Sequence, residues 1–322
     1  MKFNTSLLHA GVSKETNGST LPPVYQTSAF EQTSAADLEK IFENKAPGYC
    51  YTRVGNPTIT AFENRITKLE GGIASIACAS GMAALMNAFM NILRSGDEII
   101  SSASLYGGTI DLFTDLEAFG ITTRYVENNN WEQIEGAINE HTRLIFAETI
   151  GNPCLDVTDI ERLAEVAHSH GLPLIVDNTT STPYLIQVLK HGADIVVNSS
   201  SKYINGSSNS ISGILTDSGK FKWDKEKYPG LADYVKYGPM AFIAKLRNGL
   251  FRNTGACLSP VNAYLNIIGL ETLGLRMERQ CDNAFELAKW IESNYSDITV
   301  NYPGLESSKW HEIAKKQLTN GY

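Results

Sequence analysis

Apolar runs and helix-periodic segments alternate along the chain from about Pro57 onward. Short apolar runs, typical of buried strands, lie at 73–79, 97–102, 122–127, 142–149, 172–178 and 193–199. Segments with helical periodicity lie at 58–72, 82–96, 107–120, 130–141, 157–171 and 181–192. This alternation is typical of βαβ units. It predicts an α/β fold in which a mainly parallel sheet carries helices on both faces.

The ends of the chain do not follow this alternation. The first 56 residues predict an irregular arm with one short helix at 35–44. A run at 211–219 predicts a further strand, and the alternation of strand-like and helix-like segments ends after Asp217. Beyond that point the pattern predicts a polar loop at 220–234, long helices within 249–294 and a small strand at 298–304.

These differences predict three parts. Residues 1–56 form an N-terminal arm, 57–255 a large domain, and 256–322 the start of a small C-terminal α+β domain. Because the chain ends soon after the small strand, we expect that domain to be incomplete and to expose apolar surface.

Composition narrows the class of protein. Hydrophobic residues make up 43% of the 322 residues and charged residues 19%, so a large core is possible. A net charge of -8 without a basic patch argues against binding to nucleic acid or to an anionic membrane. The uncharged stretch 74–93 is broken by Ser80-Gly81 and holds two asparagines, so it predicts a strand, a turn and a buried helix rather than a membrane span.

Cysteine usage and the N-terminus indicate the compartment. The five cysteines are scattered and show no CxxC spacing, so they support neither a zinc site nor a disulfide framework. The six histidines form no HExxH pattern and are interpreted as surface residues, so no metal site is expected. The start of the chain lacks a long apolar segment. We therefore expect a cytoplasmic protein.

Polar groups follow the predicted strands at the edge where α/β sheets bind ligands. These groups are Ser80-Gly81-Met82, Tyr106-Gly107-Gly108, Glu148 to Asn152, Asp177-Asn178 and Ser199 to Lys202. Three of these groups also have an ordinary structural explanation. Ser80-Gly81 is also a common helix N-cap, Asp177 a common cap or turn residue, and Lys202 a possible solvent-reaching or paired lysine.

Together these groups match the needs of pyridoxal 5'-phosphate. That cofactor needs backbone amides for its phosphate, a ring to stack on, an acid for its ring nitrogen and an amine for a Schiff base. The helix start at Gly81, Tyr106, Asp177 and Lys202 supply one of each. The combination is far more specific than any single member.

At this point the sequence resembles the Cys/Met-metabolism family of pyridoxal-phosphate enzymes, which have the aspartate-aminotransferase (type I) fold. The matching pieces are YTRVGNPT, ASGMAA, LYGGT, ETIGNP, IVDNTTSTP and SSSKYINGSS, in family order. Segments 216–223, 237–260 and 269–284 look most like O-acetylhomoserine sulfhydrylases. The resemblance covers essentially the whole chain.

The resemblance implies a role for each matching residue. Lys202 would hold the cofactor as a Schiff base and shuttle protons, Asp177 would keep the ring nitrogen protonated, and Tyr106 would stack on the ring. The phosphate would be bound by Ser80, Gly81, Met82, Ser199 and Ser201, and Asn152 would lie near the ring hydroxyl. Tyr51 and Arg53 would reach the phosphate of a neighbouring subunit, which implies a homodimer or homotetramer. From the sequence alone, these two are equally an exposed loop pair.

The resemblance also implies a reaction. O-acetyl-L-homoserine would exchange its acetate for sulfide or a thiol and give L-homocysteine, a step of methionine and cysteine biosynthesis. Close relatives of the same kind include cystathionine γ-synthase and methionine γ-lyase, because the family shares its cofactor site and differs mainly in substrate pockets.

Two departures from the family pattern leave other hypotheses open. Ser207, Ser208 and Ser212 stand where sulfhydrylases carry a histidine-glycine pair and further glycines, so we expect an altered loop after Lys202. The arginine that grips the substrate carboxylate lies in a part of the family that this chain does not reach. A non-catalytic, cofactor-binding or oligomerising remnant is therefore an alternative. An unrelated binding module on the same fold is less consistent with the intact lysine constellation.

Overall fold

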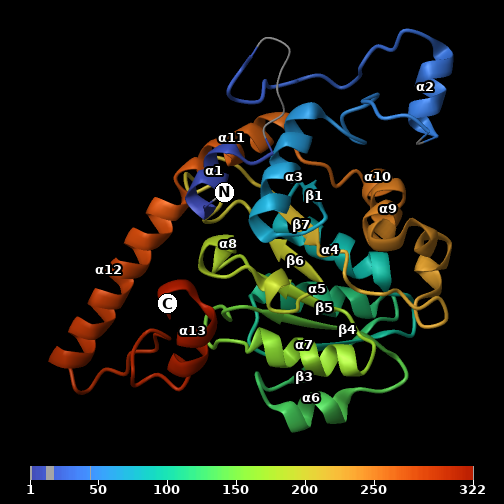
Figure 1. The fold of residues 1–322 in the computed structure, drawn as a ribbon. Helices are drawn as coiled ribbons and strands as arrows, with labels where there is room; N and C mark the ends of the chain where they lie inside the picture. The colour runs from blue at the N-terminus through green and yellow to red at the C-terminus, as the bar shows by residue number, and fades with distance from the viewer. Residues whose placement is uncertain (1, 12–17, 44, 322) are drawn as a thin grey trace.

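A seven-stranded sheet forms the centre of the computed structural model, which describes residues 2–11, 18–43 and 45–321. The strands lie in the order β1-β7-β6-β5-β4-β2-β3 (Figure 1). Their bounds are β1 (Ala74–Cys78), β2 (Glu98–Ser102), β3 (Thr122–Val126), β4 (Thr142–Glu148), β5 (Leu174–Asp177), β6 (Ile195–Asn198) and β7 (Gly213–Asp217). All six expected strands and the additional one form, and only β7 runs against its neighbours. The predicted fold class is confirmed.

Helices cover both faces of this sheet, as Figure 1 shows. They are α1 (Phe3–His9), α2 (Ala35–Phe42), α3 (Pro57–Glu70), α4 (Gly81–Ile92), α5 (Gly107–Glu117), α6 (Trp131–Ala137), α7 (Ile160–Ser169), α8 (Thr182–Leu185), α9 (Ala241–Asn248), α10 (Leu250–Thr254), α11 (Pro260–Glu271), α12 (Leu273–Asn294) and α13 (His311–Gln317). Three 3₁₀ helices are η1 (Val188–Lys190), η2 (Pro229–Met240) and η3 (Thr319–Gly321).

The strands are apolar on both sides because each face has its own core. In β2, Ile99 packs into the cluster under α4, α5 and α9, whereas its neighbour Ile100 packs into the cluster under α3, α7 and α11. β4 alternates in the same way, with Phe146 on the first face and Ile145 on the second. Successive side chains of a strand point to opposite faces, so the continuous apolar runs in the sequence follow directly.

Three local expectations were wrong or incomplete. The helix expected at 181–192 is only the short α8 and η1, separated by Ile186 in an extended conformation; Thr182 at the start of α8 has a φ of +57°. No strand forms at 298–304 within the described part of the chain, where Pro303 offers no backbone donor for a ladder. α1 was not expected; its Leu7 is buried against the core that includes α3.

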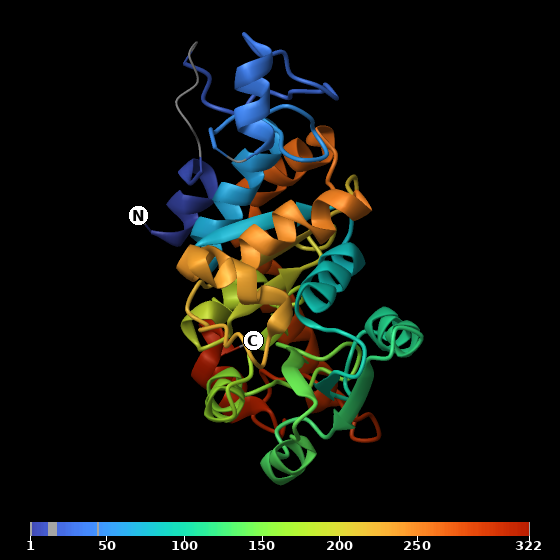
Figure 2. The same ribbon diagram turned by 90° about the vertical axis from the view of Figure 1, so that its right-hand side faces the viewer.

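The part of the N-terminal arm that carries α2 lies at the outside of the molecule (Figure 1, Figure 2), and so does α12 (Figure 1). Within 18–49, Pro22 is the one buried residue among those described, and α2 buries none. The short helix expected at 35–44 is confirmed as α2. Among the described residues, no helix is both long and apolar enough to cross a membrane.

Candidate active site

The carboxyl ends of β4, β5 and β6 lie side by side and set the position of the candidate site. The register places Glu148 opposite Asp177, and Asp177 opposite Val197 of β6. After β6 the chain turns at once, since the Lys202 amide donates to the Ser199 carbonyl at 3.1 Å. This turn brings Lys202, whose side chain is exposed, to the same edge as Asp177.

The start of α4 lies against this turn. Ser80 is the N-cap, and its hydroxyl accepts the Ala83 amide at 3.0 Å, so the ordinary interpretation of this serine is correct. In the described chain the amides of Gly81 and Met82 precede the first bonds of the helix and have no partner. A Cβ added to Gly81 would lie 2.7 Å from the Ser199 Cβ. Free amides packed against a serine form the cradle that a phosphate needs, so these residues fit that group.

The two serines assigned to the phosphate have different surroundings. The Ser199 amide donates to the Thr179 hydroxyl at 2.7 Å, which ties β6 to the turn after β5. The Ser201 hydroxyl donates to the Ser212 carbonyl at 2.9 Å and accepts the Ser212 amide at 2.7 Å. Ser199 therefore lies next to the free amides, whereas the hydroxyl of Ser201 already closes the loop after Lys202.

Asp177 ends β5 and is half-buried. One carboxylate oxygen accepts the Thr179 amide at 2.8 Å, as in an ordinary Asx turn. Burial raises the pKa of Asp177 above its usual value, and the bonds from Thr179 oppose this shift. A buried carboxylate of this kind favours a cationic partner, such as a protonated ring nitrogen.

Tyr106 and Asn152 reach the edge from two loops. Tyr106 is the N-cap residue of α5, and its ring is half exposed beside Gly108. Asn152 is exposed in the loop between β4 and α7, and it precedes Pro153 through a cis peptide bond. Both backbone amides donate to the same carboxylate, that of Glu148, at 2.7 Å from Tyr106 and 3.1 Å from Asn152.

Sequence reasoning placed Glu148 among the polar groups at the strand ends but gave it no role. Its side chain is buried, although it ends an otherwise apolar strand. Burial, followed by the charges of Asp177 and Asp156, raises the pKa of Glu148 to about 8 against the opposing effect of the two amide bonds. The signal in the sequence was a charged residue directly after the apolar run LIFA.

Tyr51 and Arg53 do not join this cluster within the chain. Tyr51 is exposed on the arm, and the Arg53 guanidinium lies 5.3 Å from the centroid of its ring. Arg53 also donates to the Arg252 carbonyl of α10. Among the described residues, neither side chain has a contact that links it to Lys202 or Asp177.

The serine-rich loop after Lys202 is strained at Ser208 and held by hydrogen bonds at Ser212. Ser208 has a φ of +55°, in the left-handed region that favours glycine. Ser212 is buried, and its hydroxyl accepts bonds from Ser200 and Asn266 at 2.8 Å each. Arg276 of α12 donates to the Tyr203 carbonyl at 2.7 Å and so braces the same loop.

A sequence model of the family described as Cys/Met metabolism PLP-dependent enzyme matches residues 4–322. The homocysteine synthase of Schizosaccharomyces pombe is 42% identical over 99% of this chain and 78% of its own length. The O-acetyl-L-homoserine sulfhydrylase of Corynebacterium glutamicum is 40% identical over 98% of this chain and 76% of its own length.

A solved structure agrees with these relatives. A provisionally assigned O-acetylhomoserine (thiol)-lyase from Campylobacter jejuni, which contains N'-pyridoxyl-lysine-5'-monophosphate, superposes with a TM-score of 0.94. It is 32% identical, and the match covers 100% of this chain and 83% of that chain.

Proposed function

Because this chain belongs to the Cys/Met-metabolism PLP-dependent enzymes, with pyridoxal phosphate as cofactor, we propose that it catalyses a γ-replacement. The substrates are O-acetyl-L-homoserine and sulfide or a thiol, and the products are L-homocysteine and acetate. One observation carries the proposal: the turn that carries Lys202, the Asp177 acid and the free amides of α4 lie at one edge of the sheet.

Each residue has a task that its surroundings support. The Gly81 and Met82 amides would hold the phosphate together with the Ser199 hydroxyl, and Ser201 would join them once its hydroxyl exchanges its bond to the Ser212 carbonyl for one to the phosphate. The carboxylate of Asp177 pairs with the ring nitrogen and keeps its proton there, which offsets the cost of burying that carboxylate. When bound, the cofactor supplies an electron sink for charge that develops at the substrate α-carbon.

The remaining residues orient the reacting groups and move protons. The Nζ of Lys202 would take the proton from the substrate α-carbon. A β-proton would then be lost, acetate would leave the γ-carbon, the sulfur nucleophile would add there, and protons would return to the β- and α-carbons. The ring of Tyr106, half exposed at the edge, would provide the stacking face, and the exposed Asn152 would bind the ring hydroxyl. The Ser80 hydroxyl keeps α4 in place by capping it.

We further propose that the enzyme works as a homodimer or homotetramer in the cytoplasm. The arm has almost no core of its own and exposes Val24, Tyr25, Phe42 and Tyr51, which suits contact with a second copy. Tyr51 and Arg53 would then complete the phosphate site of that copy. All five cysteines are free, in keeping with a reducing compartment. The division at residues 57 and 256 stays a prediction.

The test is a spectrum combined with a product assay. Purified protein is loaded with pyridoxal phosphate, and its visible absorption is recorded before and after O-acetylhomoserine and sulfide are added, while homocysteine is measured. We expect a visible band that changes with substrate, and homocysteine as product. Lys202→Ala should lose both, whereas Lys68→Ala, an exposed lysine on α3, should keep both. A visible band retained by Lys202→Ala, or a loaded wild-type protein that forms no homocysteine, would refute the proposal.

A further inference from the structure

A single buried carboxylate connects two of the site residues that come from different loops. Glu148 accepts the Tyr106 amide on Oε1 and the Asn152 amide on Oε2. Tyr106 begins α5 after β2, and Asn152 lies in the loop after β4. β2 and β4 are neighbours in the sheet, so the carboxylate joins two adjacent strand ends.

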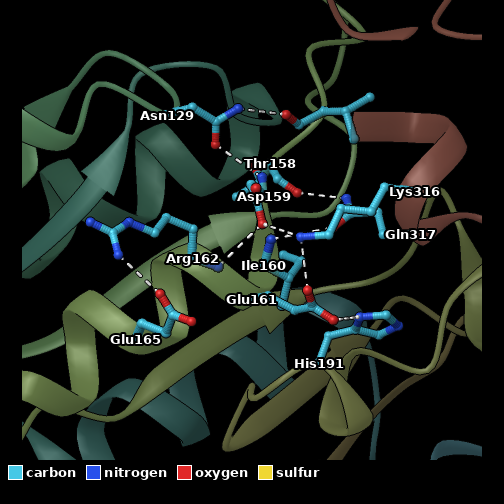
Figure 3. A network of polar contacts seen from close by, with 11 residues as sticks. Asn129, Thr158, Asp159, Ile160, Glu161, Arg162, Glu165, His191, Lys316 and Gln317 are labelled. Atoms are coloured by element: carbon cyan, nitrogen blue, oxygen red, sulfur yellow. Dashed lines mark hydrogen bonds and ion pairs between the residues drawn. The ribbon is translucent and has the colours of Figure 1, made fainter. Parts of the chain in front are cut away.

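Hydrogen bonds hold the backbone of Glu148 and the loop that follows it. The backbone carbonyl of Glu148 accepts the Thr158 hydroxyl at 2.7 Å, and an isolated bridge pairs Ile150 with Val157, which closes the loop that carries Asn152. Figure 3 shows how Thr158 is held in turn: the amide of Gln317, on α13, donates to the Thr158 carbonyl at 2.7 Å. The Glu148 side chain therefore projects from a fixed point.

The charge of Glu148 depends on what lies beside Asp177. The register places these two acids side by side on β4 and β5, with Glu148 buried and Asp177 half-buried. Their mutual repulsion disfavours two negative charges. A cation paired with Asp177 removes that repulsion. An ionised Glu148 then accepts one amide proton on each of its two carboxylate oxygens.

We propose that Glu148 is a positioning residue that fixes the Tyr106 ring and the Asn152 side chain relative to each other, so that both meet the cofactor in one orientation. This inference rests on the proposed function. Glu148 does not touch the cofactor in this scheme; it acts through the two backbone amides. A bidentate acceptor between two loops sets their separation, which neither loop could set by itself.

The first test measures the two amides directly in protein saturated with pyridoxal phosphate, where a cation beside Asp177 leaves Glu148 ionised. Hydrogen exchange is followed at Tyr106 and Asn152 in the wild type and in Glu148→Gln. A glutamine side chain offers one acceptor oxygen, and its NH2 group opposes the second amide, so exchange at one or both amides should rise by about tenfold. Exchange at Ile99 and Ile100, in the fully buried part of β2, reports whether the variant is folded.

The second test measures the cofactor. Pyridoxal phosphate is titrated into each protein, and the visible circular dichroism of the bound cofactor reports the orientation of its ring. Glu148→Gln should weaken binding by about tenfold and reduce the dichroism signal per bound cofactor. Glu148→Asp keeps the charge but is one methylene too short to reach both amides, so it should resemble Glu148→Gln. Glu135→Gln, at an exposed position on α6, is the matched control and should behave as wild type.

The outcomes separate the inference from the proposed function. If the wild type binds pyridoxal phosphate but Glu148→Gln has unchanged exchange, or unchanged affinity and dichroism, the positioning role is wrong while the proposed function stands. If Glu148→Asp matches the wild type in all three readouts, charge alone matters and the positioning role is wrong. A wild type that binds no pyridoxal phosphate overturns the proposed function, and the positioning role with it.

Discussion

Glu70 is a buried acid whose ionisation should limit the stability of this protein at alkaline pH. It is the last residue of α3 and is fully buried. Its Oε1 accepts the Asn198 amide at 2.8 Å, whereas Glu70 Oε2 and Asn198 Oδ1 have no partner in the described chain. A proton on Oε2 supplies the donor that this acid–amide pair lacks. The position at a helix C-terminus also disfavours a negative charge.

Burial raises the pKa of Glu70 from 4.5 to about 8, against the opposing effect of the Asn198 and Asn178 side chains. The folded protein therefore holds this proton at pH values where the unfolded chain has released it. The stabilising contribution is complete below pH 4.5 and is lost as the pH rises toward about 8. At about 1.4 kcal/mol for each pH unit, the loss between about pH 5 and pH 8 is of the order of 3–4 kcal/mol.

Glu70→Gln removes this dependence because glutamine is neutral and can pair with Asn198 through its own amide. The free energy of unfolding is measured by urea denaturation at several pH values in both proteins. We expect near equality at about pH 5 and a variant more stable by about 3 kcal/mol at about pH 8. Glu135→Gln, exposed on α6, should show no such gain. A constant difference between Glu70→Gln and wild type across this range would refute the protonated-acid interpretation.

Two further predictions concern backbone positions around the site. Ser208→Gly should raise the free energy of unfolding by about 1 kcal/mol, because glycine adopts the φ of +55° without strain. The neighbouring Ser207→Gly should lower the free energy of unfolding. Thermal or urea denaturation measures both variants, and equal effects would contradict this reasoning. Gly213→Ala should cost about 3 kcal/mol and weaken pyridoxal phosphate binding, because its Cβ would lie 2.1 Å from the Ser80 carbonyl oxygen. Gly136→Ala, with open space around it, should stabilise the protein slightly; similar denaturation curves for these two variants would argue against the clash.

The sequence predicts the sheet well because its strands are buried on both faces and so stand out as apolar runs. Helix 181–192 fails since Thr182 and Ile186 take non-helical conformations that the apolar periodicity does not reveal. The strand at 298–304 fails because a strand needs a hydrogen-bonded neighbour, and local pattern says nothing about neighbours. The exposed candidate residues could be picked out from the sequence alone, because each one follows an apolar run that marks a strand.

The residues to which sequence reasoning gave no role share a physical cause. Glu148 and Glu70 are ordinary charged residues in the sequence, and both become unusual only because the fold buries them next to specific partners. Which partner faces which acid depends on strand order: β4 beside β5 places Glu148 against Asp177, and β6 brings Asn198 to the end of α3. That order cannot be deduced from the spacing of residues along the chain.

This difference divides the edge of the sheet into two layers with different tasks. The outer layer, which includes Lys202, Tyr106 and Asn152, faces solvent and is free to meet a cofactor and a substrate. The inner layer, which includes Glu148 and Glu70, is buried and bonds to backbone amides or to other inner side chains. The outer residues carry the chemistry that we propose, whereas the inner residues hold the backbone that positions them. A neutral isostere in the inner layer should therefore leave the chemical groups intact and change only their placement or the stability of the fold. Affinity, cofactor orientation and pH-dependent stability are consequently more sensitive tests of the inner layer than turnover is.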